Sequence, residues 1–346
     1  MSQPLHSTLG SPRFVCLCAA SCLMHLSLFA LLPQWVWMAG HGSAAAACVP
    51  LAFFAGMVLP GPAAASTLER HSRKTVCLRS IAVLCAVPLL ALLLLPAGAA
   101  VLPLVLLQGV AYGLMQISLG STLVNDILPS SLRGRGDSAY AWAGRAAVAA
   151  GLLAGTLESK LLPTPQAVGF TLIPAIAALL LVAQTQIPVK APVHMPRLSL
   201  DRFLLPSRLP LLLSFAAAPA TIGAFAAADD TTAAMYALLF LGTLAAVPAT
   251  RLALRKRWGL YATLAVGYAA LAAGWTLALT DNTCEGTHYG AAALLCGAGA
   301  AAVSHAHLIY MLQHADHCQR GTAQNTYTLM WWLAFSAVFA LWNTPF

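Results

Sequence analysis

The stretch LLALLLLPAGAAVLPLVLLQGV, residues 89–110, contains no charged residue and does not alternate apolar with polar positions. Similar runs recur along the 346 residues, of which 60% are hydrophobic and only 8% are charged. A soluble domain carries about 25% charged residues, so this composition cannot build a water-facing surface. Continuous apolar runs favour membrane helices over a β-barrel, whose strands alternate. The sequence therefore predicts an all-α integral membrane protein.

Eleven apolar runs are candidate spans, because each approaches the about 20 residues that an α-helix needs to cross a bilayer. Their approximate limits are 14–38, 44–64, 76–96, 99–124, 138–157, 167–186, 208–228, 231–250, 259–280, 288–312 and 323–342.

The charges between these runs alternate from loop to loop. The loops after spans two, four, six, eight and ten are basic, as at Arg70 to Arg79 and Arg251 to Arg257. The other loops are nearly neutral or acidic, as at Asp229 and Asp230. The positive-inside rule then puts the basic loops and the N-terminus in the cytoplasm. We expect a multi-pass protein of the cell inner (cytoplasmic) membrane, surrounded by lipid, whose net charge of +8 reflects topology and not a nucleic-acid partner.

The chain divides after the sixth span. The segment IPVKAPVHMPRLSLDRFLLPS, residues 187–207, is the longest polar stretch and contains four prolines. It predicts a cytoplasmic linker between an N-terminal six-helix bundle, 1–186, and a C-terminal bundle of about five helices, 208–346. A weak internal repeat agrees with this division, since LLQG at 106–109 recurs as LLCG at 294–297. Repeats of this kind are expected of two-half transporter folds.

The loop ASTLERHSRK, residues 65–74, resembles the signature loop between spans two and three of the major facilitator superfamily. The family pattern is Gly-x-Leu-Ala-Asp-Arg-x-Gly-Arg-Arg/Lys. Here Glu69 replaces Asp, both glycines are replaced, and three basic residues match. Three further segments resemble the family: Gln108-Gly109 with Gly113, Asn125 to Pro129 followed by Arg133-Gly134, and the glycine face of span five at Gly144, Gly151 and Gly155.

The resemblance implies a two-bundle helical permease fold, here with about 11 transmembrane helices arranged 6+5. The family has twelve spans, so we expect the C-terminus of this chain on the outer face. The resemblance also implies alternating access to a midplane site, with substrate contacts from spans one, four, five, seven, ten and eleven. By the same resemblance, a signature-loop arginine pairs with the acidic residue at the cytoplasmic end of span four. Glu69, Arg70, Arg73 and Asp126 are therefore the predicted latch, whose alternative role is simple positive-inside anchoring.

Arg145 is the most informative single residue. It lies about seven residues into span five, which is about 10 Å from the cytoplasmic edge. A charge there is costly unless it faces a wet cavity or a partner, so an intramembrane charge indicates function. It could bind an anionic substrate group, pair with Asp126, or extend to the inner interface.

Other polar side chains within the spans are candidate substrate ligands. Gln108, Tyr112 and Gln116 recur at four-residue spacing and so share one helix face. His305 and His307 are spaced by two, so both cannot face one site, although one could carry protons. Asn325 in span eleven could add an amide contact. Each could instead serve interhelical hydrogen bonding.

We therefore expect secondary active transport of a small-molecule solute by a monomer, with protons as a candidate coupling ion. The alternative is a non-transporting polytopic protein, such as a sensor, scaffold or partner subunit, derived from a transporter fold. We expect no enzyme activity, since no catalytic constellation stands out. We also expect no cofactor, because there is no phosphate-binding glycine loop, and the nine cysteines lack metal-type spacing.

Overall fold

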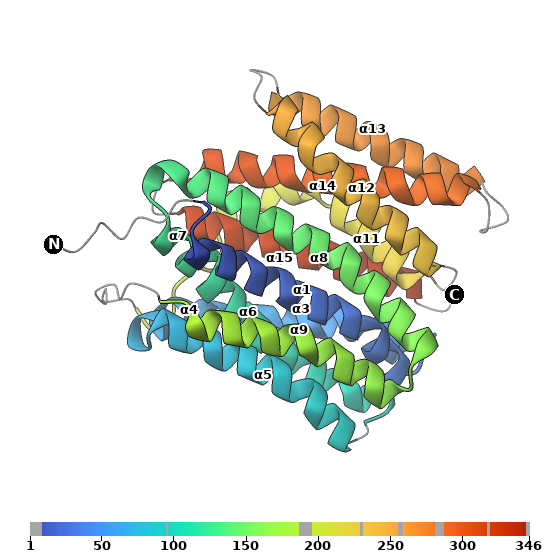
Figure 1. Cartoon of the computed structure of the whole chain (residues 1–346), viewed down its shortest axis with the longest axis horizontal. Coiled ribbons are helices and arrows are strands. Elements are labelled where there is room, and N and C mark those ends of the chain that lie inside the picture. Colours follow the sequence, from blue (N-terminus) through green and yellow to red (C-terminus); the bar gives the residue numbers. More distant parts are fainter. Residues whose placement is uncertain are drawn as a thin grey trace.

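The computed structural model describes residues 9–94, 96–186, 196–228, 231–254, 259–280, 287–316 and 319–343. Within these ranges the chain is a bundle of long helices with no strand, which run along one common direction (Figure 1). The predicted all-α class is confirmed. Leu93, Ile173 and Val266 are more than half exposed, as expected where hydrocarbon surrounds the bundle.

The first half of the bundle comprises the helices up to residue 184. In order these are α1 (Pro12–Met38), α2 (Ala44–Ala47), α3 (Val49–Val58), α4 (Gly61–Arg70), α5 (Arg73–Leu94), the 3₁₀ turn η1 (Gly98–Val101), α6 (Leu102–Ser118), the π-helical turn η2 (Leu119–Leu123), α7 (Val124–Ile127), the 3₁₀ turn η3 (Ser130–Leu132), α8 (Arg133–Leu161) and α9 (Thr164–Gln184).

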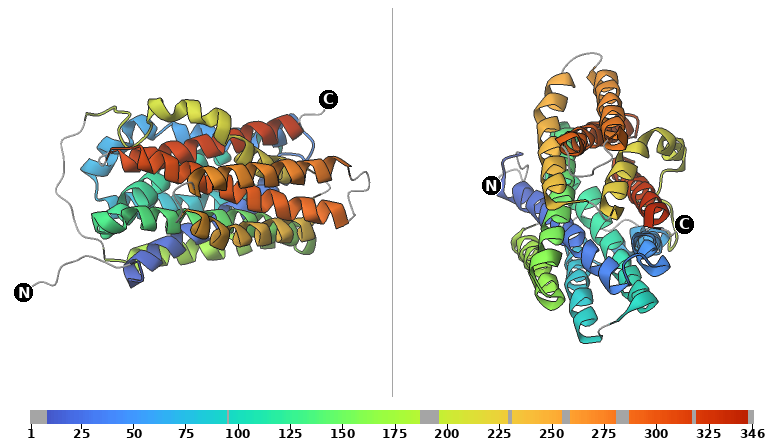
Figure 2. Two further views of the ribbon diagram at one scale, coloured as in Figure 1. Left: turned by 90° about the horizontal axis from the view of Figure 1, so that it is seen from above. Right: turned by 90° about the vertical axis from the view of Figure 1, so that its right-hand side faces the viewer.

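The second half begins after the linker. It contains the 3₁₀ helix η4 (Pro206–Leu211), α10 (Leu212–Phe215), α11 (Ala217–Ala227), α12 (Ala233–Ala253), α13 (Gly259–Thr280), α14 (Thr287–Gln313) and α15 (Arg320–Asn343). α1 begins and α15 ends at opposite ends of the bundle, as Figure 1 and the left view of Figure 2 show.

Each of the eleven predicted spans falls on a helix or on a group of consecutive helices. Seven of the described helices are long and apolar enough to cross a membrane, and up to nine spans result if each of two bent pairs counts as one. The bends measure 48° between α3 and α4 and 58° between α10 and α11. The two other predicted spans fall on α8 and α15, whose polar side chains lower their hydropathy. The count of eleven therefore stays a prediction.

The two halves use the same helix pairings. α1 packs along α8 as α11 packs along α15, and α6 contacts α3 and α5 as α14 contacts α12 and α13. α9 packs on α1 and α5, but none of the described helices takes the corresponding place beside α11 and α13. A groove lined by Ala217, Leu271 and Trp275 remains there.

The repeated LLQG and LLCG segments each lie at a close crossing of two helices. A Cβ at Gly109 of α6 would lie 2.1 Å from the carbonyl oxygen of Phe53, and one at Gly56 would lie 2.1 Å from that of Leu106. In the second half, a Cβ at Gly297 would lie 2.2 Å from the carbonyl oxygen of Leu239. Only glycine allows the backbones to approach so closely, and in lipid such contacts drive helix association. The sequence repeat is thus a packing device.

Replacing either crossing glycine should destabilise the fold. We expect Gly109→Ala and Gly297→Ala each to lower the free energy of unfolding by about 1–3 kcal/mol, because the added methyl overpacks a backbone contact. Thermal unfolding in detergent, followed by tryptophan fluorescence, measures this. Gly169→Ala is the matched control, since nothing lies within 4 Å of its Cβ position. A wild-type unfolding midpoint for Gly297→Ala would contradict the close-crossing explanation.

Candidate functional site

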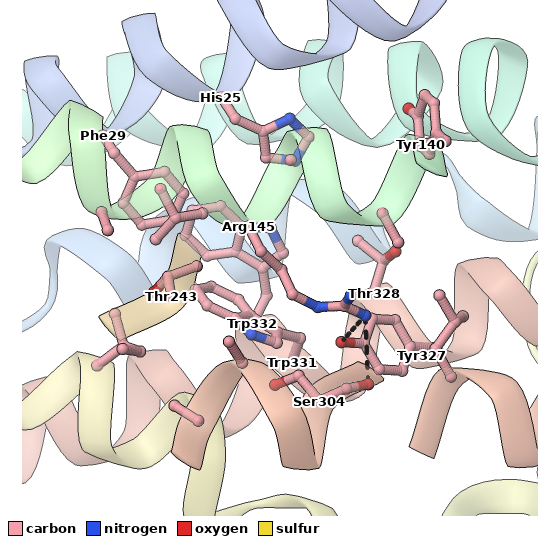
Figure 3. A pocket seen from close by; sticks show the side chains of 18 of the residues that line it. His25, Phe29, Tyr140, Arg145, Thr243, Ser304, Tyr327, Thr328, Trp331 and Trp332 are labelled. Atoms are coloured by element: carbon pink, nitrogen blue, oxygen red, sulfur yellow. Dashed lines mark hydrogen bonds between the residues drawn. The ribbon is translucent and has the colours of Figure 1, made fainter. Parts of the chain in front are cut away.

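A central cavity of about 90 Å³ lies between the two halves (Figure 3). The first half lines it with α1, α6 and α8, and the second half with α11, α12, α14 and α15. These include the six predicted substrate-contacting spans, with α12 as an addition. A cavity shared between two halves is the arrangement that alternating access requires.

Arg145 of α8 crosses this cavity to the second half. Its Nη1 donates to His305 Nδ1 at 3.0 Å, and its Nη2 donates to the Ser304 carbonyl oxygen at 3.2 Å and to Tyr327 Oη at 3.1 Å. The guanidinium also lies over the rings of Trp142 and Tyr327, at 5.3 and 5.8 Å from their centroids. Hydrogen bonds and cation–π contacts therefore stabilise the charge in the membrane interior.

The hydrogen bonds of His305 fix its protonation form. Arginine can only donate, so Nδ1 of His305 must accept and the ring is neutral, with its proton on Nε2. Nε2 faces Ser138 Oγ at 3.2 Å, and the imidazole packs against Trp142 with 4.9 Å between centroids. His305 therefore positions Arg145 through this hydrogen bond. It is not itself among the residues that line the cavity.

Polar side chains of α1, α6 and α8 form part of the cavity wall in the first half. His25 Nδ1 lies 2.7 Å from the Ser21 carbonyl oxygen, and its Nε2 lies 2.9 Å from Tyr112 Oη. Tyr140 Oη donates to Gln116 Oε1 at 3.3 Å. Tyr112 and Gln116 both line the cavity, as predicted for the polar face of α6.

An aromatic cluster covers another side of the cavity. Phe29 of α1 stacks on Trp332 of α15 with 5.2 Å between centroids and meets Trp331 edge-on at 5.8 Å. Phe53 of α3 lies 4.5 Å from Trp332, so the cluster joins both halves. All three labelled members, Phe29, Trp331 and Trp332, are on the cavity side of their helices in Figure 3.

Ionic contacts gather at the end of the bundle where α4 ends and α15 begins. Arg73 pairs with Asp126 and lies 3.8 Å from Glu69. Glu69 Oε1 in turn lies 2.9 Å from Arg202, a linker residue that the sequence analysis did not single out. We call Glu69, Arg73, Asp126 and Arg202 the ionic latch.

The described part of the linker runs from α4 to α15. Ser66 Oγ donates to the Arg197 carbonyl oxygen at 3.0 Å, while the Arg202 backbone N–H, at a left-handed φ of 61°, donates to Thr322 Oγ1 at 3.0 Å. Leu205 N–H donates to Thr326 Oγ1 at 2.8 Å. We call residues 197–205 the linker strap. The predicted linker residues 187–195 lie outside the described residues.

Comparisons with known proteins find similar structures but no similar sequence. No family model matches the chain, and no curated protein matches it in sequence. Three solved structures superpose on nearly all of it. They are the human organic anion transporter MFSD10 (TM-score 0.66, 16% identity, covering 95% of this chain and 92% of that one), a bacterial homologue of the iron transporter ferroportin (0.66, 14%, 94% and 91%) and the major facilitator superfamily transporter FucP (0.58, 14%, 95% and 97%).

This chain has the major facilitator fold. The structural superposition establishes the fold, whereas identities of 14–16% carry no substrate across. All three structures are described as those of transporters or transporter homologues.

Within this fold, the predicted site residues separate into two groups. Arg145, Tyr112 and Gln116 line the cavity. Gln108 instead accepts a 2.8 Å hydrogen bond from Trp35 Nε1, and Asn325 donates to the Phe203 carbonyl oxygen of the linker strap at 2.8 Å. Sequence spacing alone could not make this separation, because all five residues lie on helices that border the cavity.

The second histidine and the predicted latch residues also have defined places. His307 lies 3.0 Å from Ser214 Oγ, away from Arg145, as the spacing of two residues predicts. Asp126, left open as a partner for Arg145, pairs with Arg73. Arg70, the other predicted latch arginine, is exposed at the end of α4. Arg73 therefore takes the position next to the acidic residue.

Asp137 and Gln324 are among the buried polar residues that the sequence did not single out. Asp137, one turn into α8, is fully buried, neither of its oxygens has a hydrogen bond, and the nearby cations are Arg133 and Arg320. Gln324 of α15 is 4% exposed, lines the cavity, and its Oε1 has no hydrogen-bond partner. Both residues lie close to the start of a helix. There the sequence does not distinguish a buried polar residue from an exposed one.

Asn325→Ala should separate a structural role from substrate binding. Losing the bond to the linker strap leaves a buried carbonyl unsatisfied, so we expect a cost of about 1–3 kcal/mol in unfolding free energy. Solute affinity should stay within twofold of wild type. Asn343→Ala is the control, because that amide bonds back to Phe339 of its own helix. Thermal shift with and without solute measures both effects, and an affinity loss without destabilisation would contradict the structural role.

Proposed function

We propose that this chain is a secondary active transporter that moves a small solute by alternating access through the central cavity. The observation that carries the proposal is the position of Arg145, which extends from the first half across the cavity to acceptors of the second half. The two halves repeat each other's helix packing, and this charge lies between them within the membrane. A solute pathway accounts for such a charge better than a scaffold does.

The proposed cycle uses the latch and the strap at one end. For the cavity to open to that end, α4 and α15 must separate, so the bonds that the linker strap makes to both must break. In this proposal the chain works as a monomer in the inner membrane, and the latch end faces the cytoplasm with the N-terminus.

Flux in reconstituted vesicles tests the function. The full chain, purified and inserted in liposomes, is offered a panel of labelled sugars, organic anions, amines and nucleosides under solute and pH gradients. We expect saturable, gradient-dependent flux of one solute class. Monodisperse, folded protein that moves no compound of the panel would instead favour the sensor, scaffold or subunit alternative.

Glu69→Gln should weaken the latch. The variant removes the charge that faces Arg202 and Arg73, and so favours separation at the latch end. Spin labels at positions 135 and 313, exposed sites on α8 and α14 at that end, report the separation. We expect a larger long-distance population in double electron–electron resonance. Asp316→Asn, an exposed carboxylate, is the charge-matched control. Identical distributions for wild type and Glu69→Gln would refute the latch.

Asp137 is our candidate for proton coupling. Neither oxygen of its buried carboxyl group has a hydrogen-bond partner, whereas His305 is held neutral by Arg145. We expect Asp137→Asn to abolish accumulation driven by a pH gradient while solute exchange across the vesicle membrane continues. The comparison of driven uptake with exchange in the same vesicles measures this. Unchanged driven uptake would remove Asp137 from the coupling path.

A further inference from the structure

The charge balance of the central cavity indicates what kind of solute it binds. Its described lining includes one arginine and no aspartate or glutamate. Each hydrogen-bond acceptor of Arg145 is neutral: a histidine nitrogen, a backbone carbonyl and a tyrosine hydroxyl. Burying a charge that lacks a countercharge is costly, and an anion in the cavity would offset that cost.

The guanidinium has capacity for such an anion. Arginine has five N–H donors, and its Nε is buried without a hydrogen-bond partner. A carboxylate oxygen accepts about twice as strongly as the neutral acceptors now in place. An incoming carboxylate would therefore compete with Ser304 and Tyr327 for the same donors.

The rest of the lining suits an apolar solute body that carries one further polar group. Phe29, Trp331 and Trp332 present ring surfaces beside Arg145 in Figure 3, and flat rings pack on such surfaces. Gln324, which is 4% exposed, also lines the cavity, and its buried Oε1 has no hydrogen-bond partner. That oxygen would accept from a hydroxyl or amide N–H of the solute.

We infer that the cavity binds a compact organic anion, a carboxylate on an aromatic or other apolar body, with Arg145 as the residue that contacts the carboxylate. The inference rests on the proposed function for its physiological meaning but concerns binding alone. It also links binding to motion. A solute that draws the guanidinium away from α14 and α15 removes a contact between the halves, and so favours their separation.

Equilibrium binding to the purified full chain tests the inference with matched probes. The probes are labelled phenylacetate, benzoate and 4-hydroxyphenylacetate, their neutral amides phenylacetamide and benzamide, the amine phenethylamine, and acetate as an anion with no ring. We expect at least one aromatic carboxylate to bind at least tenfold more tightly than its amide, than the amine and than acetate. Equal affinity of acid and amide, or no binding of any carboxylate, would overturn the inference.

Variants assign the contact to Arg145. We expect Arg145→Gln to weaken carboxylate binding at least tenfold and amide binding less than threefold, and Arg145→Lys to recover part of the loss. Arg79→Gln, an exposed arginine of α5, is the matched control and should bind as wild type. Should Arg145→Gln not be monodisperse, Arg145→Lys alone decides, since loss of bidentate geometry must still weaken the acid more than the amide. Equal effects on acid and amide would overturn the assignment.

The outcomes also separate this inference from the proposed function. Tight carboxylate binding with no flux in vesicles would retain the anion site and remove the transport proposal. Flux of a neutral or cationic solute, with no carboxylate binding, would retain the transport proposal and remove the anion site.

Discussion

The bonds of Arg145 to His305, Ser304 and Tyr327 are the constraint around which the two halves are arranged. Hydrocarbon offers no hydrogen-bond partners, so a charge within the bundle must find them across the interface or cost several kcal/mol. The first half supplies the cation and the second half supplies the acceptors. The same bonds therefore stabilise the interface and define the most polar point of the cavity.

The remainder of the packing isolates this polar point from lipid. In each half, reciprocal glycine–carbonyl contacts such as Gly109 on Phe53 and Gly297 on Leu239 bring two helix backbones together without intervening side chains. Those close crossings join the helices within each half. The interface between the halves includes aromatic contacts such as Phe29 on Trp332 and the hydrogen bonds of Arg145. In the proposed alternating access, the halves would move against each other at this interface.

Closure at the latch end uses different chemistry from the cavity. Glu69 and Arg202 form an ion pair at this end of the bundle, and the linker strap adds backbone bonds to Thr322 and Thr326 of α15. In the proposed cycle these bonds would exchange with water as the end opens, so that their rupture would cost less than breaking similar bonds within hydrocarbon. A linker that connects the halves covalently thus also holds their ends together noncovalently.

The sequence alone determined the membrane character and the helical class, because these depend on local composition and period, and its weak internal repeat indicated two halves. It also singled out Arg145, since a charge in an apolar run is costly wherever the run packs. It could not decide which polar residue faces the cavity: Gln116 does, Gln108 bonds to Trp35, and Asn325 secures the linker strap. Nor could it find Asp137 or Gln324, or choose Arg73 over Arg70. Those outcomes depend on the rotation of each helix about its axis and on contacts between residues more than a hundred positions apart, which only the tertiary structure specifies.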